Sequence, residues 1–170
     1  MSRESVDGRV HESAARRWGS GVVGGLVGGV AMGVILHVVE LLPLIGAVFG
    51  SRTYLVGWLG HLLMSVFFGL VFVLLVSLPF IRDFTETFGG TVGMGVFYGA
   101  MLLIFSGGIM LPLIVMALGQ GELPLPLLPI PMFVEVLTLP LAVGIGHLLY
   151  GTLLGIVYAG TKHGWKSPEN

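Results

Sequence analysis

The chain has 170 residues, of which 55% are hydrophobic and only 10% are charged, and its formal net charge is -1. A water-soluble domain carries about 25% charged residues, so this composition excludes an ordinary globular protein of the cytosol. The near-neutral charge argues against a nucleic-acid partner. Cysteine is absent, which excludes disulfides and thiolate sites. The 28 glycines lie mainly within apolar runs, a habit of membrane helices.

A polar leader, residues 1–18, precedes the first apolar run and mixes arginines with acidic residues. Its mixed charge favours a solvated leader over a helix on the membrane surface. A secretory signal would place a short apolar core closer to Met1 and end at a cleavage site of small residues. We therefore expect the first apolar run to be a true membrane span.

Four apolar runs are long enough to cross a bilayer, since a helix needs roughly 20 apolar residues to do so. In chain order they cover residues 19–45, 54–79, 89–117 and 132–161. A proline-rich segment, residues 119–131, separates the last two and cannot form a regular helix, and residues 162–170 form a polar tail. The predicted fold class is an all-α integral membrane four-helix bundle with a Pro-rich outer loop between spans three and four.

Charge sets the expected orientation. An even number of spans places both termini on one side, and that side collects every lysine and arginine except Arg52. Because cytoplasmic segments carry the excess of positive charge, we expect a multi-pass protein of the cell (plasma or inner) membrane with both termini in the cytoplasm. Trp18 and Trp165 then flank the cytoplasmic ends, and Tyr54 and Trp58 lie near the outer end of the second span, as interfacial aromatic residues do.

The sequence also contains an internal repeat. Residues 60–71 and 146–157 are identical at six of twelve positions without a gap, and both begin with Gly-His. A weaker echo at a constant offset of 69 links residues 31–45 to residues 100–114. Two spans per copy predict two helical hairpins of parallel orientation, related by an axis along the membrane normal. In this register Ser106 takes the place of His37.

Rows of small residues at four-residue spacing let helix backbones approach closely. On the first span such a row leads to His37, and similar rows continue from His61 and His147. We therefore expect all three histidines to point into the bundle, at one depth, with Glu40 on the face of His37. The packing rows contain Gly21, Gly25, Gly29, Gly33, Gly69, Gly151 and Gly155.

Three segments carry a resemblance to a known family: Gly57–His61 (Gly-Trp-Leu-Gly-His), Gly146–Gly151 (Gly-His-Leu-Leu-Tyr-Gly) and Leu154–Tyr158 (Leu-Gly-Ile-Val-Tyr). They resemble a family of uncharacterised small four-span membrane proteins of archaea and bacteria with duplicated Gly-His helical hairpins. The resemblance covers about residues 20–161 and implies a four-helix integral membrane domain. It implies no activity and no ligand.

Short loops, glycine faces and the lack of a nucleophile motif or phosphate loop favour a non-catalytic accessory or assembly subunit. Its expected partners are the lipid bilayer and other membrane protein subunits, or a second copy of the chain. Hydrolysis or group transfer has the least support, because no carboxylate on the second span orients His61 beside Ser65.

The histidines leave other functions open: binding of a haem or a metal ion, and transfer of protons or small ions. His61 and His147 could supply the axial ligands of a b-type haem, or a cluster of His37, Glu40, His61 and His147 could bind a transition metal such as zinc, copper or iron. The same groups could instead form a relay for protons or small ions. Against all of these stands a plain packing role, in which each ring only bonds to a neighbouring carbonyl or hydroxyl.

Overall fold

The structure, a computed structural model, describes residues 3–117, 119 and 132–164. These residues form helices and connecting turns without a strand: α1 (Arg3–Val38), α2 (Leu42–Val48), α3 (Tyr54–Val76), α4 (Pro79–Arg82), the 3-10 helix η1 (Asp83–Thr85), α5 (Phe88–Phe105), the π-helix η2 (Ser106–Met110), α6 (Leu111–Ala117) and α7 (Met132–His163). Segments long and apolar enough to cross a membrane are Ala14–Val38, Tyr54–Val76, Phe88–Ile114 and Thr138–His163. The all-α class with four candidate membrane spans is confirmed. Apart from Gly119, the Pro-rich segment lies outside the described residues.

The first helix differs from its prediction at both ends. It begins at Arg3, so the segment expected to be a solvated leader is helical and continuous with the first span. It ends at Val38 rather than at residue 45, because Glu40 adopts a left-handed backbone conformation with φ 58°. The Leu41 amide then donates to the Leu36 carbonyl at 2.9 Å and the Glu40 amide to the His37 carbonyl at 3.2 Å, which is a Schellman cap.

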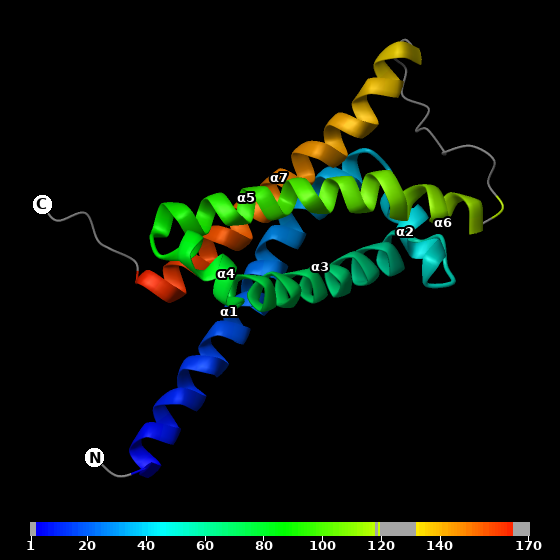
Figure 1. The fold of residues 1–170 in the computed structure, drawn as a ribbon. Coiled ribbons are helices and arrows are strands. Elements are labelled where there is room, and N and C mark those ends of the chain that lie inside the picture. The colour runs from blue at the N-terminus through cyan, green and yellow to red at the C-terminus, as the bar shows by residue number, and fades with distance from the viewer. Residues whose placement is uncertain (1–2, 118, 120–131, 165–170) are drawn as a thin grey trace, which may run out of the picture.

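The long helices pack in the order α3, α1, α7, α5, so that α1 and α7 form the middle of the bundle (Figure 1). The N-terminal part of α1 extends beyond the other helices at one end, and the N-terminal part of α7 extends at the opposite end (Figure 1). α2 packs on the beginning of α3. The connection through α4 and η1 lies beside the C-terminal end of α7, where the Lys162 ammonium donates to the Thr85 carbonyl at 2.6 Å.

Glycines allow the backbones of α1 and α7 to approach closely. A Cβ atom at Gly28 would lie 2.8 Å from the Tyr150 carbonyl oxygen, and one at Gly24 would lie 3.3 Å from that of Leu154. Any larger residue would push the two helices apart. The glycines of the rows identified in the sequence also lie against a facing helix: Gly21, Gly25, Gly29 and Gly33 against α3, Gly69 against α1, and Gly151 and Gly155 against α5.

Side chains rather than backbones separate α3 from α5. The ring of Phe72 lies 5.3 Å from that of Tyr98, and the ring of Phe68 lies 6.4 Å from that of Phe105. The Tyr98 hydroxyl donates to the Phe68 carbonyl at 2.8 Å. These rings hold α3 and α5 apart, in contrast to the close contact of α1 with α7, and leave space between the helices toward the α2 end.

The close approach of α1 to α7 predicts an asymmetry between two glycine substitutions on the same helix. Gly28→Ala should lower the free energy of unfolding by about 1–3 kcal/mol, because overpacking forces the helices apart. Gly19→Ala is the matched control, since a Cβ there meets nothing within 4 Å. Alanine favours helix over glycine by up to about 1 kcal/mol, so the control should be neutral or stabilising. Unfolding by sodium dodecyl sulfate in mixed micelles measures both; equal losses would contradict the packing described.

Candidate functional site

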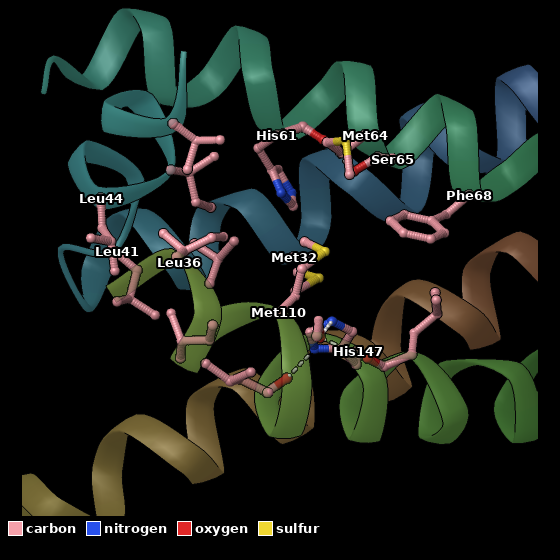
Figure 2. Close-up of a pocket in the computed structure, with 18 of the residues that line it drawn as sticks. Met32, Leu36, Leu41, Leu44, His61, Met64, Ser65, Phe68, Met110 and His147 are labelled. Carbon is pink, nitrogen blue, oxygen red and sulfur yellow. Dashed lines mark hydrogen bonds between the residues drawn. The ribbon is translucent and has the colours of Figure 1, made fainter. Parts of the chain in front are cut away.

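A cavity of about 180 Å³ lies in the half of the bundle nearest α2, bounded by α1, α2, α3, α5, η2, α6 and α7 (Figure 2). Most of its walls are apolar, and both His61 and His147 contribute to them. The groups that matter for its chemistry are Met32, His61, Met64, Ser65, Ser106, Met110, His147 and Tyr150. The cavity therefore brings the two Gly-His segments together around one space.

His61 is buried, with 7% of its surface exposed, and its Nε2 lies 2.9 Å from the Gly29 carbonyl oxygen. A carbonyl only accepts, so Nε2 carries the proton and donates this bond. In the neutral ring Nδ1 then has a free lone pair. Among the described residues none bonds to Nδ1, and no buried side-chain nitrogen or oxygen is left without a partner. Nδ1 therefore keeps a free lone pair, on a ring that lines the cavity.

His147 is equally buried but has both ring nitrogens occupied. Its Nδ1 lies 2.8 Å from the Val143 carbonyl and donates to it. Its Nε2 lies 2.6 Å from the Ser106 hydroxyl. Since Nδ1 carries the proton of the neutral ring, this hydroxyl donates to Nε2, and its single proton is then not available to the Leu102 carbonyl, which also lies 2.6 Å away. Ser106, which the sequence register made the equivalent of His37 in the second repeat, thus bonds to His147. Both nitrogens of the His147 ring therefore serve packing contacts within the bundle.

The expected inward position of His37 and Glu40 is wrong, because both side chains are exposed. His37 lies at the rim of the bundle, with its ring centroid 4.7 Å from that of Tyr54 and 6.3 Å from that of Trp58. A row at four-residue spacing turns by about 40° per step, because a helix has 3.6 residues per turn. The row that starts at Gly21 has therefore left the bundle interior by the time it reaches His37, and Glu40 belongs to the helix cap.

The geometry opposes the candidate metal cluster and the haem. His37, Glu40, His61 and His147 are not brought together, and the described residues contain no group of three His, Asp or Glu side chains placed to bind a metal ion. A bis-histidine haem needs a free nitrogen on each ring, and His147 has none. A cavity of about 150 Å³ holds a benzene molecule, so this one of about 180 Å³ does not enclose a porphyrin. The exposure of His37 and Glu40 also removes two members of the proposed proton relay.

The cavity wall also contains Tyr150 and three methionines that the sequence patterns did not predict as site residues. The Tyr150 hydroxyl donates to the Ser65 carbonyl at 2.6 Å and ties α7 to α3. Met32, Met64 and Met110 line the cavity from α1, α3 and η2. Apolar residues of these types fill any membrane helix, so only their convergence on one cavity distinguishes them.

No protein-family model, curated protein or solved structure matches the chain. The resemblance of its Gly-His segments to a family of small four-span membrane proteins therefore stays a prediction. The function is inferred from the cavity and from the outer faces of the helices.

The bond between Ser106 and His147 predicts a stability effect. Ser106→Ala should lower the free energy of unfolding by about 1–2 kcal/mol, since it leaves Nε2 of a buried imidazole without a donor. Thr152→Ala is the matched control, because the Thr152 hydroxyl only donates to the Leu148 carbonyl within its own helix at 2.7 Å. Unfolding in mixed micelles measures the difference, and equal effects of the two substitutions would contradict the described pairing.

Proposed function

We propose that the protein is a non-catalytic accessory or assembly subunit of a membrane complex, and that the outer face of α5 contacts the partner. The observation that supports this most directly is the low burial of the third span. In the most apolar 18-residue stretch of this span only 17% is buried within the bundle, against 39–44% in the corresponding stretches of the other three spans. A partner subunit or a second copy of the chain would cover the remaining face.

Three glycines on this span support the same proposal. A Cβ at Gly89, Gly93 or Gly108 would meet nothing within 4 Å, whereas the glycines of the other rows lie against a facing helix. Glycine weakens a helix by up to about 1 kcal/mol relative to alanine, and small residues are enriched where membrane helices meet. Gly89 and Gly93 on α5 and Gly108 on η2 would have a packing role only with another helix present.

The polar groups near the cavity favour binding over catalysis. The Ser65 hydroxyl donates to the His61 backbone carbonyl at 2.8 Å, so it does not donate to the His61 ring. The described part of the cavity wall contributes no carboxylate to orient an imidazole. A serine nucleophile activated by this histidine therefore has no support.

We infer a cell-membrane location with both termini cytoplasmic. Arg82 and Lys162 lie at the end of the bundle where α4 and η1 meet the end of α7, and Arg52 lies at the opposite end, in the connection between α2 and α3. The excess of positive charge at the first end supports its cytoplasmic position.

We also infer that the two hairpins are copies of one unit, as in the family that the Gly-His segments resemble. The contacts of α1 with α3 have counterparts between α5 and α7. A Cβ at Gly25 would meet the Ser65 carbonyl, and one at Gly95 would meet the Gly151 carbonyl. Gly25 and Gly95 are 70 positions apart, one more than the echo in the sequence, which moves the position equivalent to His37 from Ser106 to Gly107.

Site-specific crosslinking tests the subunit proposal. Benzoyl-phenylalanine in place of Phe97, on the outer face of α5, should give a protein adduct of discrete mass on illumination of intact membranes. The same group in place of Phe67, on α3, is the control, since the two phenylalanines are 56% and 55% exposed. An adduct of twice the chain mass identifies self-association, and any other discrete mass identifies a different subunit. No adduct at Phe97, or equal yields at both positions, would overturn the proposal.

Cysteine labelling tests the orientation, because the chain has no cysteine of its own. Ser51→Cys, between α2 and α3, should react with a membrane-impermeant maleimide in intact cells. Glu86→Cys, between η1 and α5, should react only after the membrane is permeabilised. The reverse pattern would place the termini outside.

A further inference from the structure

The methionines of the cavity share a chemistry that the proposed subunit role does not use. Met32, Met64 and Met110 come from three different helical segments, and their side chains all line the cavity together with His61. In the close-up view Met32 and Met110 lie between the rings of His61 and His147, and Met64 lies beside His61 (Figure 2). The cavity thus presents thioether sulfurs and one imidazole nitrogen with a free lone pair.

We propose that this cavity binds a copper(I) ion through the sulfurs of Met32, Met64 and Met110 and through Nδ1 of His61. Thioether sulfur is a soft ligand that selects copper(I) among the biological metals. Imidazole also binds copper, and metal-binding histidines commonly donate their other ring N–H to a backbone carbonyl. The bond from His61 Nε2 to the Gly29 carbonyl is of that kind and fixes the tautomer in which Nδ1 can bind a metal.

The charge of the site favours a monovalent ion. Thioethers and a neutral imidazole bring no negative charge, and the described cavity wall includes no Asp or Glu side chain. The cost of moving an ion into a medium of low dielectric constant is large and grows with the square of its charge. The free energy of transfer into the cavity would therefore be much less favourable for zinc and copper(II) than for copper(I). Magnesium or calcium would lack the oxygen ligands that they require.

The cavity is also adaptable enough to close around an ion. Met32 is buried, whereas Met64 and Met110 are half-buried, and unbranched methionine side chains can change rotamer at low cost. His147 cannot serve as a fifth ligand without breaking one of its bonds to Val143 and Ser106. The site is separate from the outer face of α5, so it stands whether or not a partner covers that face.

Titration of the purified full-length protein in detergent tests the proposal. Under anaerobic conditions with ascorbate, copper(I) should transfer from its bicinchoninate complex to the protein at one ion per chain, and zinc(II) should not compete. X-ray absorption of the copper-loaded protein should show sulfur and nitrogen scatterers together. Met32→Leu, Met110→Leu and His61→Asn should each weaken binding at least tenfold.

Met101→Leu is the matched control, because Met101 is 41% exposed on α5 and does not line the cavity; it should leave the affinity unchanged. Leucine and methionine are similar in volume, so the methionine-to-leucine variants should keep the thermal unfolding temperature of the apoprotein. If a variant unfolds, the X-ray absorption spectrum of silver(I) bound to the unaltered protein shows whether sulfur atoms bind the ion. Absence of sulfur scatterers, unchanged affinity after all three cavity methionines become leucine, or binding of an apolar molecule instead of copper would overturn the proposal.

Discussion

The contact between α1 and α7 is the constraint on which the rest of the bundle depends. Gly24 and Gly28 present bare backbone to Leu154 and Tyr150, whose backbone atoms and side chains lie directly against the two glycines. In a membrane such close packing replaces the hydrophobic driving force that is absent between lipid-exposed helices. α3 and α5 lie on either side of this central pair. A further set of glycines packs α3 against α1, and another packs α5 against α7.

The cavity follows from the unequal separation of the helix pairs. Where α1 meets α7 the small residues are glycines, but where α3 faces α5 the chain has Phe68, Phe72 and Tyr98, whose rings keep the helices apart. The polar groups near the resulting space are paired: Tyr150 with Ser65, His61 with Gly29, and Ser106 with His147. Because an unpaired polar group in hydrocarbon is costly, these pairings stabilise the described cavity wall. The free lone pair of His61 Nδ1 is the feature of this wall on which the proposed ligand site rests.

Part of the candidate site could be predicted from the sequence, but only some of the predicted residues line the cavity. His61 and His147 were predicted to face inward, and they line one cavity. The prediction for His37 was wrong because a row at four-residue spacing drifts around the helix. The prediction for Glu40 was wrong because Glu40 itself adopts the left-handed conformation that ends α1, and such a turn is usually marked by glycine. Met110 lies in the π-helix η2, whose wider turn shifts the facing of every residue after it, and helical periodicity does not reveal where such a turn occurs.

Few charges and long apolar runs determined by themselves that the protein is helical, that it has four segments able to cross a membrane, and approximately where three of those segments begin and end. These properties depend on local hydrophobicity and on backbone hydrogen bonds within each helix. The tertiary structure alone decided which glycines meet which helix, that α3 and α5 stand apart, and that three methionines line the same cavity as His61. Such contacts join residues far apart in the chain, and their register depends on the packing of all four helices at once.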